Sequence, residues 1–169
     1  MDDTLPRGEA ALKAALADLG IDPPWVEHEA AFTVAQSQSL GLETVGLHTK
    51  NLFLKDKKGA IFLLTAPEDA EIDLKTVHKA LGGRGRVSFG APALLAETLG
   101  VAPGSVTPLG LINDTEARVR FFVHPGVAAA RHINVHPLRN TATVTLTQDE
   151  FCRLLAHVGH PPTVLPDVT

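Results

Sequence analysis

The alternation of apolar and polar residues is clearest between residues 48 and 67. Residues 50–55 alternate as a strand does, residues 55–59 form a charged turn that ends in glycine, and residues 60–66 are almost entirely apolar. Two such runs joined by a charged turn containing glycine indicate a β-hairpin. Because the second run has no polar face, we expect a central strand that is covered on both sides.

Helical periodicity marks the two ends of the chain. The apolar positions with helical spacing near the start are Leu12, Ala15, Leu16 and Leu19. We expect Thr4 to cap this first helix and Gly20 to end it. Near the other end, Thr147 followed three residues later by Glu150 forms a capping box, which predicts a final helix that ends at about Val158.

The remaining segments alternate between short strands and short helices. Strands are expected at residues 25–30, 118–123, 130–135 and 141–146, and helices at residues 33–40, 74–81 and 92–99. We interpret residues 82–86, 104–110 and 124–126 as loops or turns. This order predicts an α/β (α+β) fold, with a mixed, mostly antiparallel sheet and helices packed around it. At 169 residues, positions 1–169 fit a single domain, with any disorder confined to residues 1–6 and 161–169.

The net charge of −4 argues against a protein that binds long nucleic acids through many phosphates, so DNA is not an expected partner. No apolar run is long enough to cross a membrane and no secretory signal is visible, so we expect a cytoplasmic protein. A cluster of basic residues remains. It fits equally well a solvent-exposed turn or a basic border around a pocket that receives one end of an RNA. Its members are Lys50, Lys55, Lys57, Lys58, Arg84 and Arg86.

The usual cofactor and metal motifs are missing. The chain has no nucleotide-binding glycine motif, and its single cysteine, Cys152, excludes an internal disulfide and is expected to pack in the core. None of the eight histidines belongs to an HExxH motif. His132 and His136 share one face of an expected strand but lie too far apart to bind one ion. We therefore expect neither a metal nor another cofactor.

Polar residues do gather at the ends of expected strands. Lys50 and Asn51 open one strand, His136 closes another, and Arg139 and Asn140 precede a third. Residues 104–108 form a loop whose backbone N–H groups could converge on a carbonyl oxygen. A lysine, an amide, a histidine and free N–H donors are enough to orient an ester and to stabilise developing negative charge.

Three stretches together resemble the prolyl-tRNA editing family, the free-standing relatives of the insertion domain of bacterial prolyl-tRNA synthetases. They are residues 48–56 (HTKNLFLKD), 104–108 (GSVTP) and 136–143 (HPLRNTAT), which occur in the order and spacing of that family. The resemblance runs from about Thr4 to Gly159. It implies a deacylase without zinc or nucleotide cofactor, which hydrolyses the ester between a small wrong amino acid and proline tRNA.

Alanine is the first candidate for that amino acid. The pocket of a prolyl-tRNA synthetase, which is made for proline, cannot strongly exclude the smaller alanine, because missing apolar contacts discriminate by only about 1–3 kcal/mol. The resemblance implies that Lys50 holds the terminal nucleotide, that His136 and Gly104 belong to the catalytic centre, and that a water molecule attacks. It places the substrate against Asn51, Ser105, Val106, Thr107, Pro108, Leu109 and Asn140, with Val106 and Leu109 able to set the pocket size.

The expected partner is the acceptor end of a misacylated proline tRNA, and docking to a prolyl-tRNA synthetase stays open. Three other interpretations compete with this one. The same kind of deacylase could act on cysteine or serine, the chain could be a binding module without turnover, or it could be a metal-dependent hydrolase. Tests with differently charged tRNAs and with a chelator distinguish among them.

Overall fold

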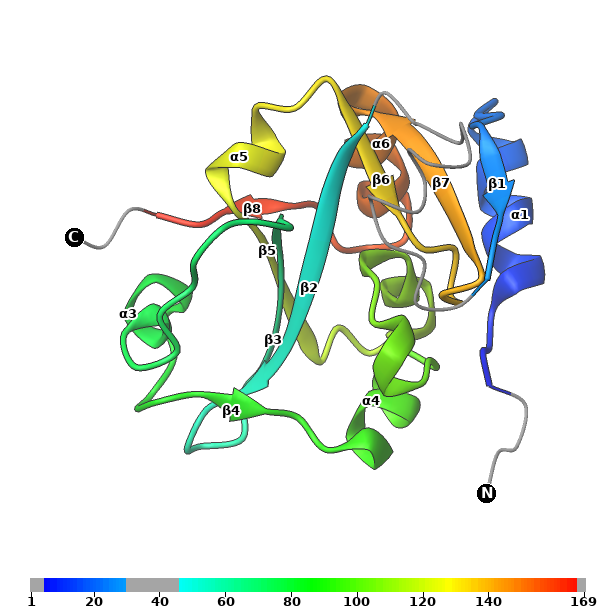
Figure 1. The fold of residues 1–169 in the computed structure, drawn as a ribbon. Coiled ribbons are helices and arrows are strands. Elements are labelled where there is room, and N and C mark those ends of the chain that lie inside the picture. The colour runs from blue at the N-terminus through cyan, green and yellow to red at the C-terminus, as the bar shows by residue number, and fades with distance from the viewer. Residues whose placement is uncertain (1–4, 30–45, 167–169) are drawn as a thin grey trace.

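The computed structural model describes residues 5–29 and 46–166, which form an eight-stranded sheet with helices packed around it (Figure 1). The strand order is β1-β7-β6-β2-β3-β5-β8, and β4 pairs with β2. The strands are β1 (Trp25–Glu27), β2 (Leu47–Lys55), β3 (Ile61–Pro67), β4 (Ser88–Phe89), β5 (Val119–Val123), β6 (His132–Val135), β7 (Ala142–Thr147) and β8 (Thr163–Val164). The helices are α1 (Glu9–Asp18), α3 (Val77–Leu81), α4 (Pro92–Thr98), α5 (Pro125–Ala128) and α6 (Gln148–His157), with the 3-10 helices η1 (Pro103–Ser105) and η2 (Pro108–Asn113).

The sheet is mixed, as predicted. β1 with β7, β2 with β3, β2 with β4 and β6 with β7 pair antiparallel, whereas β2 with β6, β3 with β5 and β5 with β8 pair parallel. The expected hairpin is present, with β2 and β3 in register from Thr49 opposite Pro67 to Lys55 opposite Ile61. The fold class inferred from the order of elements is therefore confirmed.

Strand β3 is central and covered on both faces, as its apolar sequence predicts. Ile61 and Leu63 belong to a large core cluster with residues of α1, α4, η2 and α6. Phe62 and Leu64 belong to a second, smaller cluster with α3. Alternation along the strand places these two sets on opposite faces, so the sheet separates the two clusters.

The two terminal helices form as expected, with one change at the start. The capping box of α6 is complete, because the Thr147 side chain accepts from the Glu150 N–H and the Glu150 side chain accepts from the Thr147 N–H. Helix α1 begins after Gly8, whose φ of 93° suits glycine. The predicted N-cap Thr4 and the predicted helix at 33–40 lie outside the described residues. Cys152 is half-buried at the edge of the large cluster, and burial raises the pKa of its thiol.

Five segments differ from the sequence prediction. Residues 104–110, expected as a loop, contain η1 and the start of η2, and residues 124–126, expected as a turn, begin α5. Each of these three short helices carries proline near its first turn, where its fixed φ favours helix and its missing N–H costs nothing. Helix α3 is shorter than residues 74–81. The unpredicted two-residue strands β4 and β8 depend on pairing with β2 and β5, which local sequence does not reveal.

Candidate functional site

The amide of Asn51 joins strand β2 to the loop between η1 and η2. Its Nδ2 donates to the carbonyl of Val106 at 3.1 Å, and its Oδ1 accepts from the Thr65 hydroxyl at 2.6 Å. Thr65 is the direct partner of Asn51 in β3 and is fully buried. The neighbouring strand thus fixes the orientation of the amide, and the amide fixes the 104–108 loop against the sheet.

The same loop is bonded to the segment that follows β6. The Thr107 hydroxyl donates to the carbonyl of His136 at 2.6 Å and accepts from the N–H of Leu109 at 3.2 Å. The Ser105 hydroxyl accepts from the N–H of Asn140 at 3.1 Å. A Cβ on Gly104 would lie 3.4 Å from the side-chain nitrogen of Asn140, so the Asn140 side chain lies next to Gly104. Loop 104–108 and segment 136–140 are therefore held as one unit.

His136 has a defined tautomer. Its Nδ1 lies 2.8 Å from the carbonyl oxygen of Ala142, and because a carbonyl oxygen can only accept, Nδ1 carries the proton. In the neutral ring the Nε2 atom is then an acceptor, and it has no partner among the residues that the structure describes. Burial, together with the nearby His28, lowers the pKa of His136 despite the opposing effect of the bond to Ala142. The site thus holds a neutral imidazole with one free lone pair.

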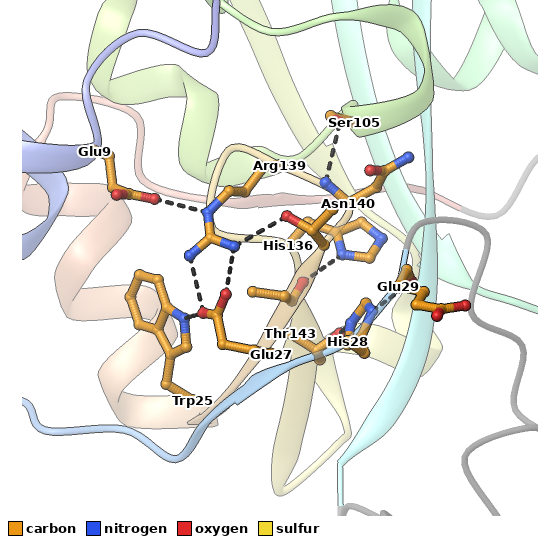
Figure 2. A network of polar contacts seen from close by, with 12 residues as sticks. Glu9, Trp25, Glu27, His28, Glu29, Ser105, His136, Arg139, Asn140 and Thr143 are labelled. Carbon is orange, nitrogen blue, oxygen red and sulfur yellow. Dashed lines mark hydrogen bonds and ion pairs between the residues drawn. The ribbon is translucent and has the colours of Figure 1, made fainter.

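A second histidine, His28, lies beside the first, with the ring centroids 6.2 Å apart. Its Nδ1 is 2.9 Å from the carbonyl oxygen of Glu29, so its Nε2 accepts from the Thr143 hydroxyl at 2.8 Å (Figure 2). Both nitrogens of His28 are thereby occupied. Of the two rings, His136 is the one whose nitrogen is available for a substrate or a water molecule.

Arg139 connects this segment to α1 and β1. Its guanidinium donates to Glu9 at 2.9 Å and binds both carboxylate oxygens of Glu27 at 2.7 and 2.9 Å, and it lies over the Trp25 ring (Figure 2). These bonds lower the pKa of Glu27 to about 2 and raise that of Arg139. The adjacent Leu138 is fully buried with a φ of 75°, an unusual conformation for a residue with a side chain. Arg139 therefore helps to hold a strained turn between His136 and Asn140.

Lys50 lies elsewhere. Its ammonium donates to the carbonyl of Ala70, in the segment after β3. Along β2, Leu52 and Leu54 pack with the small cluster, whereas Phe53 packs with the large one. By this alternation Lys50 is on the face of α3, and Asn51 is on the face of the 104–108 loop.

The structure thus brings together most of the residues proposed from sequence. Asn51, loop 104–108, His136 and Asn140 form one bonded group, whereas the Lys50 ammonium is bonded on the opposite face. Val106 is half-buried, and Pro108 and Leu109 are buried, Leu109 within the large cluster. Sequence reasoning identified Arg139 but not His28 or Thr65 as part of this group, because the roles of these two residues depend on partners elsewhere along the chain.

The group has the elements of an ester-hydrolysing site. The N–H of Gly104, an exposed residue, donates to no described residue, so it is available to an oxyanion. Nε2 of His136 is available to accept a proton or to orient water. Within residues 5–29 and 46–166 there is no group of three or more histidine, cysteine or acidic side chains arranged to hold a metal ion. No helix in those ranges is long and apolar enough to cross a membrane.

Comparison with known proteins places this group in context. Residues 28–154 match the model of the aminoacyl-tRNA editing domain. The chain is 38% identical over 160 residues to prolyl-tRNA synthetase associated domain-containing protein 1 of Bos taurus, covering 92% of this chain and 93% of the relative. It is 32% identical over 151 residues to the prolyl-tRNA editing protein ProX of Acetoanaerobium sticklandii, covering 89% and 92%.

A similar fold occurs in a solved structure of a candidate trans-editing enzyme for prolyl tRNA synthetase. The TM-score is 0.67 at 22% identity, and the match covers 98% of this chain and 100% of the other. At that level of identity the likeness concerns the fold. The match to the editing-domain model covers the three sequence stretches that build the bonded group around His136.

Proposed function

We propose that this chain, which belongs to the aminoacyl-tRNA editing domain family, is a free-standing deacylase that hydrolyses alanine from mischarged proline tRNA. Family membership and the similarity to a prolyl-tRNA editing protein support an editing function that acts on tRNA. One observation supports hydrolysis: the free Nε2 of His136 belongs to the same bonded group as the unpaired N–H of Gly104. We expect it to act in the cytoplasm, and docking to a prolyl-tRNA synthetase is part of this proposal.

In the proposed reaction a water molecule attacks the carbonyl carbon of the aminoacyl ester. The Nε2 of His136 accepts a proton of the water, and the N–H of Gly104 stabilises the resulting oxyanion. The bond from the carbonyl carbon to the ribose oxygen then breaks, and that oxygen takes up a proton. The products are the free amino acid and the tRNA with its terminal hydroxyl restored.

Selectivity for alanine over proline is proposed to be steric. The 104–108 loop is fixed by Asn51 on one side and by the 136–140 segment on the other, so it cannot easily widen. Val106, the half-buried residue in that loop, is the one best placed to limit the size of the acyl group. A rigid small pocket rejects proline by overlap, which is stronger than the loss of one apolar contact.

The test is deacylation of proline tRNA charged separately with alanine, cysteine, serine or proline. We expect the alanyl ester to be hydrolysed well above its spontaneous rate and the prolyl ester to be spared. If only the cysteinyl or seryl ester is hydrolysed, cysteine or serine replaces alanine as the proposed substrate. If tRNA binds without any turnover, the chain is a binding module. The variant His136→Ala controls for contaminating deacylases, and loss of activity with EDTA would indicate a metal-dependent enzyme.

A further inference from the structure

A basic cluster lies at the hairpin end of β2, away from the bonded group around His136. It differs from the cluster expected from sequence by one member, because Lys50 lies farther along β2 and Arg120 takes its place. The six members are Lys55, Lys57, Lys58, Arg84, Arg86 and Arg120, all of which are exposed. The first three come from the turn between β2 and β3, the next two from the loop after α3, and Arg120 from β5. None of the six forms an ion pair with a carboxylate of any residue that the structure describes. Their positive charge is therefore presented to solvent.

The cluster is organised by one buried carboxylate. Asp56 is only 5% exposed and accepts from the N–H groups of Lys58, Ala60 and Arg84 at 2.8–2.9 Å. These backbone bonds, with that of Arg84 contributing most, lower the pKa of Asp56. The carboxylate thus joins two basic loops that are far apart in sequence, and its own charge is directed inward at backbone donors.

Two further contacts bring the loops together. The N–H of Lys57 donates to the carbonyl of Arg84 at 3.3 Å, and the aliphatic part of the Lys57 side chain lies against Gly85. A Cβ at Gly85 would come within 2.8 Å of that side chain, and the φ of 85° at this position also favours glycine. The glycine-rich sequence after α3 therefore lets the two loops pack closely, which fixes the spacing of their cations.

Acidic residues do not neutralise the cluster. At the nearby start of β5, Glu97 is bonded to Arg118 at 2.7 Å and Glu116 interacts with the same arginine. Both carboxylates thus face Arg118, which is not a member of the cluster. Arg120 interacts with the buried Asp56 carboxylate and lies over the Phe62 ring, and none of the other five cations forms an ion pair with a described residue. A group of exposed cations on a protein of net charge −4 is the local pattern expected for phosphate recognition.

We propose that this basic cluster binds the phosphate backbone of the tRNA acceptor stem, next to the nucleotides that enter the catalytic group. This inference rests on the proposed function. Lys55 and Asn51 belong to the same strand and are four residues apart, about 13 Å at a rise of about 3.3 Å per residue. That distance equals about four steps of a nucleic-acid strand at about 3.4 Å each. An ester held beside Asn51 would place the first base pairs of the stem over the cluster.

The test compares a full tRNA with a substrate too short to reach the cluster. The double variant Lys57→Ala with Lys58→Ala should bind uncharged proline tRNA about 10-fold more weakly and should reduce the slope of log Kd against log salt concentration by about 2. It should lower kcat/KM for alanyl-tRNA by a similar factor. It should leave unchanged the rate on alanine esterified to a CCA trinucleotide. Arg131→Ala is the matched control, because Arg131 is an exposed cation just before β6, near the opposite end of β2.

The outcomes separate the two proposals. If the wild type hydrolyses neither substrate but loses tRNA affinity in the double variant, the proposed function fails and the phosphate surface stands. If the wild type hydrolyses both substrates, and the double variant binds and deacylates the full tRNA as the wild type does, the phosphate surface is refuted. An equal effect of Arg131→Ala would also refute it, because the binding would then reflect overall charge.

Discussion

Lys50 and Asn51 are consecutive residues of β2, yet they act on opposite faces of the sheet. The Lys50 ammonium is bonded to the carbonyl of Ala70, whereas the Asn51 amide is bonded to the carbonyl of Val106 at 3.1 Å. A strand necessarily directs neighbouring side chains to opposite sides. The strand begins at Leu47, so these two residues lie within it and not at its start as the sequence predicts. Because they face opposite sides, they have separate roles, and each requires its own test.

For Asn51, we expect substitution by alanine to release the 104–108 loop and to leave the buried hydroxyl of Thr65 without its acceptor. Hydrolysis of alanyl-tRNA should fall about 100-fold, because small displacements of a catalytic loop have large effects on rate. The free energy of unfolding should fall by about 1–3 kcal/mol. Urea unfolding and kcat/KM measure the two effects. Asn51→Asp is the informative comparison, since it keeps the acceptor for Thr65 and loses the donor to Val106, so it should preserve more stability than activity.

For Lys50, we expect substitution by alanine to abolish hydrolysis while the fold is retained. This follows if the ammonium exchanges the carbonyl of Ala70 for the terminal nucleotide when tRNA binds. Deacylation kinetics and thermal unfolding of Lys50→Ala, beside the exposed control Lys75→Ala, test this role. An unchanged rate with a lowered melting temperature would show that Lys50 only tethers the segment after β3.

The pH dependence of kcat/KM should report on His136. The base is the neutral ring, and burial and His28 lower its pKa, so activity should rise with pH to a midpoint below 6.5 and remain level above it. Because the nearby His28 contributes to this lowering, His28→Gln should move the midpoint upward. His136→Asn should reduce the plateau by about 10²–10⁴-fold. A midpoint that does not move in His28→Gln, or a plateau retained in His136→Asn, would remove this histidine from the proposed base role.

Arg139→Ala should reduce kcat more than it raises KM, because Arg139 holds the turn between His136 and Asn140 and need not touch the substrate.

The ion pair between Arg139 and Glu27 should also make stability depend on pH. The pKa of Glu27 is about 2 against an ordinary 4.5, so its pairing stabilises the folded state above about pH 4.5 and is lost as the pH falls toward 2. Thermal unfolding of Arg139→Ala should therefore depend less on pH over that interval than that of the wild type. Compared with Arg139→Ala, the variant Arg139→Lys should restore little of the lost kcat, since one ammonium cannot reproduce the two-oxygen contact with Glu27. A similar loss of kcat in Arg153→Ala, on the exposed side of α6, would show the effect to be unspecific.

Several features could be predicted from local sequence, because short-range interactions determine them. The β2–β3 hairpin follows from alternation and a charged turn, the N-terminus of α6 from Thr147 and Glu150, and the stop of α1 from Gly20, which has a φ of 70°. The central position of β3 follows from its lack of a polar face. The three stretches that compose most of the bonded group were also recognisable in the sequence, although their contacts were not.

Only the tertiary structure decided which of those residues meet. Arg139 pairs with Glu9, 130 residues away, and with Glu27, 112 residues away, and no local pattern encodes such a choice. The tautomer of His136 depends on a carbonyl of the next strand, and the separation of Lys50 from Asn51 became visible once both faces of β2 were covered. The physical reason is common to all three. Hydrogen bonds and ion pairs form wherever folding places donor and acceptor side by side, and that placement depends on the packing of the whole sheet.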